Sequence, residues 1–303
     1  MKSKTTIIIL LMIISSALCA CQHIDSLAQA AKNNDLLDPG TADMISLSAR
    51  AFGAAAENIT PDQEYYIGRA VAANILNNYK IWDGDKKLTN YLNLICAAIV
   101  LNSPQPTIYN GYYVVILDTD EINAFATSGG HIFVTRGILN AAKTEDALAG
   151  VIAHEVAHIQ LRHGIKAIKT NRMTQALMET AQAGIGNAMG LSQNELSDIM
   201  DESVSEIMHT MVNSGYSKEQ EYEADVAAMY FMAYAGYKPS GLIDMLNELN
   251  KIHVSGRFSR THPEPKQRIF FAELAIKRFN IADTSKDRQE RFNELVKMGA
   301  ITR

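Results

Sequence analysis

The chain has 303 residues, of which 47% are hydrophobic, and this is enough to form the core of one large domain or two small ones. Its net charge is -5 and no basic cluster is longer than two residues, which argues against a nucleic-acid partner. Beyond residue 21 no apolar stretch reaches about eighteen residues, so we expect no membrane-spanning helix there.

The first residues have the pattern of a secretory signal peptide, which we expect over residues 1–20. Basic residues precede an apolar stretch at 7–14, which is too short to cross a bilayer. Leu18–Cys21 also resembles the bacterial lipobox, which would place a lipid on Cys21; an ordinary signal peptide cleaved nearby is the alternative. By the same resemblance, Gln22 favours the periplasmic face of the outer membrane of a bacterial cell envelope as the location of the lipid-anchored chain.

Helical patterns dominate the next part of the chain. Residues 21–60 read as a tether followed by a helix, and the capping-box pattern of Thr60–Gln63 begins another helix that should run to about Tyr79. The acidic segment Asp83–Asp85 reads as a turn; a calcium loop is the alternative, although the other ligand positions of such a loop are absent. A further helix is expected over 88–101.

The hydrophobic pattern then changes to short strands. Runs rich in β-branched and aromatic residues occupy 112–117, 124–126 and 131–135, which predicts a small mixed or antiparallel sheet. Such a strand beside a metal can bind a substrate backbone by strand addition, and Gly129 and Gly130 would allow close approach. A purely structural hairpin remains the alternative.

The apolar run over residues 146–161 predicts a buried helix, with Thr144 as its N-cap, and it contains the pattern His-Glu-x-x-His at 154–158. Histidines four residues apart lie on one helix face and can share a tetrahedral zinc ion. The glutamate between them, Glu155, can accept a proton from an attacking water. The alternative is a structural helix that carries these residues by chance.

Catalytic zinc needs a third protein ligand, and the best candidate segment is Ser217–Asp225. Ser217 and Gln220 form a capping box, so we expect a helix from there to about residue 234. Glu221 and Asp225 share one helix face, which would let the first bind metal while the second orients a histidine. Glu219 and Glu223 have the same spacing on another face, so spacing alone leaves both pairs open.

Six motifs in this order resemble the zinc metallopeptidase family of HtpX and the prenyl-protein (CAAX) endopeptidases, and its periplasmic lipoprotein branch in particular. They are Asn123–Phe125, Gly129–Gly137, Glu145–Ala149, His154–His158, Glu221–Asp225 and Thr261–Pro263. The resemblance covers roughly residues 60–280 and implies an α+β, mainly helical, zincin-like domain, with a small β-sheet beside the metal helix. We therefore expect the metallopeptidase domain over 61–280 and a C-terminal helix over 281–303.

The resemblance also implies roles for individual residues. One zinc ion per chain would be bound by His154, His158 and Glu221, with Asp225 orienting a ligand and Glu155 as the catalytic base. Substrate would bind along an edge strand at Gly130–Phe133. The residues expected to contact substrate are Asn123, Gly130, His131, Ile132 and Phe133.

Two further segments carry open alternatives. His262 is implied to act near the zinc, either by donating a hydrogen bond to the oxyanion or by capping the metal at rest; Thr261 and Glu264 can instead make it part of a helix-entry capping box. Arg268 is expected to form a structural ion pair. The Met-rich segment 171–215 reads as a packed helical hairpin or, alternatively, as a mobile lid.

The expected function is that of a zinc metalloendopeptidase acting on unfolded, misfolded or unassembled envelope proteins, in protein quality control. The membrane would be met through the lipid on Cys21. The alternative is a lipid-anchored chaperone or assembly factor for outer-membrane proteins, with little proteolytic turnover.

Overall fold

The computed structural model describes residues 59–168, 204–205, 207, 209, 215–252, 262, 265–277 and 285–297. The chain divides into two compact units, Met1–Ile59 with Ile168–Ile199 and Thr60–Ala167 with Met200–Arg303. All the helices and strands below belong to the second unit. The expected signal peptide, the expected lipidation site Cys21, most of the tether and most of the segment 171–215 lie outside the described residues.

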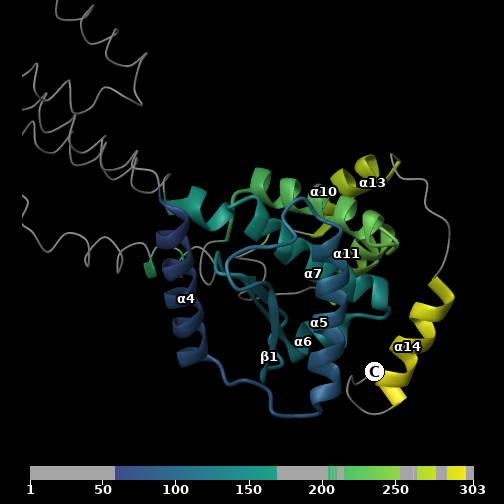
Figure 1. Ribbon diagram of the computed structural model, residues 1–303. Coiled ribbons are helices and arrows are strands. Elements are labelled where there is room, and N and C mark those ends of the chain that lie inside the picture. The colour runs from purple at the N-terminus through teal and green to yellow at the C-terminus, as the bar shows by residue number, and fades with distance from the viewer. Residues whose placement is uncertain are drawn as a thin grey trace, which may run out of the picture. The chain divides into compact units, whose positions relative to one another are not determined.

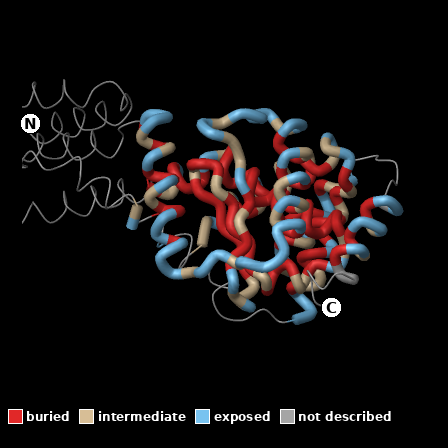
Figure 2. The backbone as a smooth tube through the Cα atoms, turned by 60° about the horizontal axis from the view of Figure 1, so that its bottom comes forward, coloured by how far each residue is buried: buried red, intermediate tan, exposed pale blue. Residues whose placement is uncertain are grey.

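Helix α7 (Glu145–Gln160) is the central element of this unit, and all of its residues are buried. It is apolar around most of its circumference, and such a helix is stable only when other elements cover it on all sides. Helices α5 (Lys86–Leu101), α10 (Lys218–Tyr234) and α11 (Ser240–Lys251) pack against it, together with the sheet (Figure 1). Figure 2 shows buried backbone gathered in the middle of the described part and exposed backbone on the peripheral helices.

The helix starts follow the predicted capping signals. Thr60 and Gln63 form the reciprocal capping box of α4 (Pro61–Asn78), and Ser217 and Gln220 form that of α10. The Thr144 side chain accepts a hydrogen bond from Ala147 N at 3.0 Å at the start of α7. These side chains satisfy backbone N–H groups that have no partner within the helix, so the three predicted starts are confirmed.

The acidic segment at 83–85 bends at Gly84 and leads directly into α5. Asp85 is the N-cap of α5, and its Oδ1 accepts from Lys87 N at 2.8 Å. Within α5, the Cys96 side chain is a free thiol that is 1% exposed, which makes it a small apolar core residue.

The three strands form one mixed sheet in the order β1-β3-β2. Strand β1 (Tyr113–Leu117) runs parallel to β3 (His131–Thr135), and β2 (Ala124–Ala126) runs antiparallel to it. Substrate was expected to bind along an edge strand at Gly130–Phe133, but β3, which contains most of these residues, is the central strand. Because β3 is paired on both sides, its peptide groups already bond to neighbouring strands, and an edge next to α7 is provided by β2 instead.

The remaining helices are α6 (Arg136–Ala141), α13 (Pro265–Ile276) and α14 (Ser285–Lys297). Helix α14, inside the range where a C-terminal helix was expected, is held to the first turn of α7 by ion pairs. Arg291 Nη2 lies 2.6 Å from Glu145 Oε1, and Arg288 Nε lies 2.8 Å from Asp146 Oδ1. Two acidic residues that favour the N-terminal end of a helix therefore also bind a distant element.

The described part of the chain is mainly helical with a small sheet beside the metal helix, which confirms the predicted fold class. Among its helices, none is both long and apolar enough to span a membrane.

Candidate active site

Helices α7 and α10 bring three buried donor groups together. His154 Nε2 and His158 Nε2 lie 3.0 Å apart, because residues four apart share one face of α7. Glu221, in the first turn of α10, places Oε1 at 3.4 Å from His158 Nε2 and Oε2 at 3.6 Å from His154 Nε2. Among the described residues, these three form the group of possible metal ligands whose donor atoms lie close enough together to bind one ion.

The distances from the Glu221 oxygens to the two histidine nitrogens, 3.4 and 3.6 Å, fit a tetrahedral metal ion, whereas the two histidine nitrogens lie closer together, at 3.0 Å. Metal–ligand bonds of about 2.0–2.2 Å at tetrahedral angles separate neighbouring ligand atoms by roughly 3.3–3.6 Å. In addition, the Glu221 Oε1 atom is buried and makes no hydrogen bond with the described residues. Leaving a buried acceptor unsatisfied costs about 1–3 kcal/mol, and a metal ion bound here would remove that cost.

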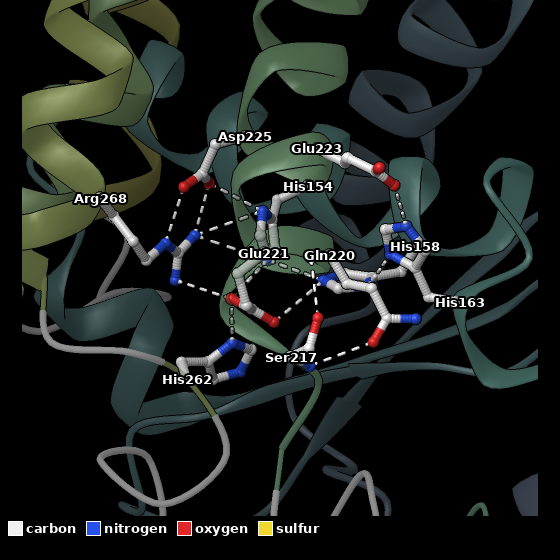
Figure 3. Close-up of polar contacts among 10 residues, drawn as sticks. All are labelled: His154, His158, His163, Ser217, Gln220, Glu221, Glu223, Asp225, His262 and Arg268. Carbon is white, nitrogen blue, oxygen red and sulfur yellow. Dashed lines mark hydrogen bonds and ion pairs between the residues drawn. The ribbon is translucent and has the colours of Figure 1, made fainter. Parts of the chain in front are cut away.

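Asp225 and Arg268 hold the outer side of His154 (Figure 3). Asp225 Oδ1 lies 3.0 Å from His154 Nδ1, and one turn of α10 separates Asp225 from Glu221. Arg268, from α13, donates to both Asp225 oxygens, through Nε at 2.8 Å and Nη2 at 2.6 Å. A proton on His154 Nδ1 that faces the carboxylate leaves the Nε2 lone pair directed toward the metal position. The ion pair expected for Arg268 is present.

The outer side of His158 is held by a residue to which the sequence analysis assigned no role. His163 Nδ1 lies 2.8 Å from His158 Nδ1, and His163 Nε2 lies 3.3 Å from Glu223 Oε2. Helix α7 ends at Gln160, and Arg162 adopts a left-handed conformation with φ 57° that turns the chain so that His163 contacts His158. The sequence does show a third histidine, His163, five residues after the motif. Only the turn at Arg162 reveals that its side chain contacts His158.

Glu155 is buried and lines two adjoining cavities, of which one is bordered by all three residues of β2 and the other by Ala124 alone among them. The residues around the β2 cavity are Ala124, Phe125, Ala126, Glu155, His158, Gly215, Tyr216 and His262. Burial raises the pKa of the Glu155 carboxyl, which suits a group that must accept and then release a proton. Tyr216, also not singled out from the sequence, stacks on the His158 ring with the ring centroids 4.4 Å apart.

His262 binds the carboxylate of Glu221. Its Nδ1 lies 2.9 Å from Glu221 Oε2, and its side chain lines both cavities beside Glu155. This contact differs from the two implied roles, because the partner of His262 is a candidate ligand. The capping box expected from Thr261 and Glu264 lies outside the described residues.

The carboxylates of Asp225 and Glu221 differ from that of Glu155 in the direction of their pKa shifts. Burial alone would raise the pKa of Asp225, but the Arg268 guanidinium lowers it to about 2. Burial likewise opposes the ionisation of Glu221, but the charge of His262 and the nearby nitrogens of the three histidines hold its pKa well below the ordinary range. The site thus combines two stable anions on α10 with one proton-accepting carboxyl on α7.

The residues expected to contact substrate do not form one surface. Ile132 and Phe133 belong to the core, at 0% and 1% exposure, and the His131 Nδ1 atom lies 3.0 Å from Thr127 Oγ1. Asn123 is fully buried, and its Oδ1 accepts from Ala124 N at 3.0 Å. The substrate role expected for β3 stays a prediction that the structure does not favour, because the central place of β3 commits these residues to the sheet and core, whereas β2 borders the cavity.

Comparison with known proteins points to the same chemistry. The chain is 27% identical to the metalloprotease LoiP of Escherichia coli over 270 residues, covering 88% of this chain and 94% of LoiP. It is 30% identical over 155 residues to the mitochondrial metalloendopeptidase OMA1 of Schizosaccharomyces pombe, covering 48% of this chain and 41% of OMA1. It is 26% identical over 190 residues to the beta-barrel assembly-enhancing protease of E. coli, covering 61% and 38%. The chain thus spans nearly all of LoiP but less than half of the other two relatives.

The model of peptidase family M48 matches residues 89–274, which include α7 with its two histidines, α10 with Glu221 and Asp225, and α13 with Arg268. The motif, the buried donor atoms and this match agree, and the chain therefore belongs to peptidase family M48.

Proposed function

We propose that the chain is a zinc-dependent endopeptidase of the bacterial cell envelope that hydrolyses unfolded or misassembled proteins. The observation that carries this proposal is the position of Glu155. This buried carboxyl lines one cavity together with the candidate ligand His158 and the β2 strand. This arrangement supports the proposal, because peptide hydrolysis requires a proton acceptor close to both a metal ion and the bound substrate backbone.

His154, His158 and Glu221 would hold one zinc ion, since two imidazoles and one carboxylate form a common catalytic zinc donor set. When bound, zinc would polarise the scissile carbonyl and lower the pKa of the attacking water. Glu155 accepts the proton of that water and returns it to the leaving amine. Asp225 and Arg268 keep His154 oriented throughout.

The substrate backbone is proposed to pair with the edge of β2 that faces away from β3, which is paired with no other strand among the described residues. Asn123 O accepts from Thr135 N at 3.1 Å, and Thr127 N donates to His131 O at 2.9 Å, so these residues bond to β3. In an antiparallel pair the peptide groups alternate in direction, and those of Ala124 and Ala126 therefore point away from β3. A substrate bound in this way must be extended, which favours unfolded segments over folded domains.

The envelope location rests on the signal-peptide and lipobox patterns, with Cys21 as the lipid anchor on the periplasmic face of the outer membrane. The match to the E. coli metalloprotease LoiP over 94% of its length supports a bacterial protease of similar extent. The second candidate function is an assembly factor that binds outer-membrane proteins and cleaves them rarely. It is favoured by the partial match to a protease named for enhancing β-barrel assembly.

The test is to measure zinc content and casein cleavage for the full chain purified in detergent. Glu155→Gln removes the proton acceptor, and Glu221→Gln removes one candidate ligand. Glu219→Gln is the matched control, because Glu219 is an exposed glutamate in the first turn of the same helix α10.

We expect one zinc per wild-type chain, zinc without cleavage in Glu155→Gln, loss of zinc in Glu221→Gln, and wild-type behaviour of Glu219→Gln. Zinc binding without cleavage by the wild type would favour the assembly factor. A wild-type chain that binds no zinc would overturn the ligand assignment.

A further inference from the structure

A chain of polar contacts leads from the metal position to the protein surface through His163. His158 Nδ1 and His163 Nδ1 lie 2.8 Å apart, and His163 Nε2 is 3.3 Å from Glu223 Oε2. Figure 3 shows His163 and Glu223 on the opposite side of the site from Asp225 and Arg268. The Glu223 side chain is 55% exposed and lies 3.6 Å from Lys166 Nζ, whereas His163 is fully buried.

The short distance between two Nδ1 atoms determines where the protons are. Two ring nitrogens can hydrogen-bond only when one carries the proton and the other offers a lone pair. If His158 Nε2 faces a metal ion, its proton is on Nδ1, so His158 donates and His163 accepts. The proton of neutral His163 must then lie on Nε2, where it faces the Glu223 carboxylate.

We propose that His163 is a positioning residue for the metal ligand His158, and that Glu223 keeps His163 in the tautomer that can accept the His158 Nδ1–H. The two histidine ligands are then supported differently. His154 contacts a carboxylate directly, whereas His158 reaches a carboxylate through a second imidazole. The proposal rests on the proposed zinc function, because it assigns a role toward the bound metal.

A purely structural role for His163 makes a different prediction. The His163 ring packs edge-on against His158, with the centroids 4.9 Å apart, and its centroid lies 5.8 Å from that of Tyr216. If packing alone mattered, an aromatic ring of similar size would preserve zinc affinity. If the hydrogen bond matters, the same replacement weakens zinc binding even where the metal-free fold is stable.

The experiment measures the zinc dissociation constant by chelator competition, and the thermal unfolding of the metal-free form, for the full chain. His163→Phe keeps a ring but removes the acceptor, and we expect a zinc affinity about 10–100-fold weaker. His163→Asn places an amide oxygen close to the position of Nδ1, and we expect it to bind zinc more tightly than His163→Phe despite its smaller side chain.

Glu223 and Glu219 provide a second pair of variants. Both side chains lie on the surface of α10, so we expect their substitution to leave the fold intact. Glu223→Ala should weaken zinc binding several-fold, while Glu219→Ala, an exposed change on the same helix, should leave it unchanged. These two variants decide the question if His163→Phe fails to fold.

The outcomes separate the two proposals. A wild-type chain without zinc overturns the proposed function, and this inference with it. A wild-type chain that binds zinc, together with unchanged affinity in His163→Phe, overturns the positioning role alone. So does an affinity of His163→Asn no better than that of His163→Phe. If His163→Phe does not fold, equal affinities of Glu223→Ala and Glu219→Ala overturn it.

Discussion

Arg268 binds Asp225 through two parallel hydrogen bonds, Nε to Oδ2 at 2.8 Å and Nη2 to Oδ1 at 2.6 Å. Both side chains are buried, and Asp225 also contacts His154. The two-pronged geometry matches a guanidinium to a carboxylate, and it joins α13 to the metal helix through a residue of α10.

Replacing Arg268 by methionine should destabilise the metal-free protein by about 3–5 kcal/mol, because it leaves the Asp225 carboxylate buried without its partner. Urea unfolding followed by circular dichroism measures the change. The matched control is Arg136→Met, since Arg136 Nε lies 2.7 Å from Asp118 Oδ1 but both side chains are over a third exposed. An exposed pair contributes about 0–1 kcal/mol to the free energy of unfolding. Equal losses of stability in the two variants would contradict the larger contribution expected of the buried pair.

The same pair predicts how stability depends on pH. Arg268 lowers the pKa of Asp225 in the folded protein to about 2, against an ordinary value of 3.8. A lowered pKa contributes stability that is fully present above the unfolded value and is lost as pH falls through the folded one. We expect a contribution of about 2 kcal/mol that disappears between pH 4 and pH 2.

Asp225→Asn should remove this part of the pH dependence, which is measured as the slope of the unfolding free energy against pH in the metal-free protein. Asp83→Asn, at an exposed position ahead of α5, is the control and should keep the wild-type slope. An Asp225→Asn protein with an unchanged acid slope would show that other groups cause the loss.

His262→Ala should lower casein cleavage at saturating zinc by about 10²–10³-fold if His262 donates to the oxyanion from the cavity that it shares with Glu155. It should also weaken zinc binding, because His262 Nδ1 lies 2.9 Å from Glu221 Oε2 and helps to orient that ligand. Steady-state rates at rising zinc concentration separate the two effects. His131→Ala, in β3, is the control. Full activity of His262→Ala at high zinc would exclude the oxyanion role of His262 and leave only its role in orienting Glu221.

Tyr91→Phe should destabilise the protein by about 1–2 kcal/mol. The Tyr91 hydroxyl donates to Glu145 Oε2 at 2.6 Å, and Glu145 is only 1% exposed in the first turn of α7. Thermal or urea unfolding measures the loss. Tyr66→Phe removes a hydroxyl from a ring that is 56% exposed and should change stability by less than about 0.5 kcal/mol. Similar losses in both variants would argue against a specific role of the Glu145 contact.

Much of the helical framework was predictable because its signals are local. The capping box at Thr60, the cap at Thr144 and the capping box at Ser217 each join residues three apart, and all three helices begin where those patterns predict. The pairing of His154 with His158 is local in the same sense, since one helical turn brings them to a common face.

The sheet was predictable only in part. Its three strands lie close to their predicted ranges, but strand order depends on backbone hydrogen bonds between segments that composition does not distinguish. The placement of β1 beside β3 makes β3 the central strand and leaves β2 next to the cavity. The substrate strand therefore could not be selected from Gly130–Phe133 alone.

The sequence by itself determined the metal helix, its caps and the helix that carries Glu221, because each is defined by residues within one or two turns of one another. Tertiary structure decided what surrounds the ligands. Arg268 meets Asp225 across 43 residues of chain, and Glu223 meets His163 across 60. Such contacts depend on how whole helices pack and on the left-handed conformation of Arg162, and neither leaves a periodic pattern in the sequence.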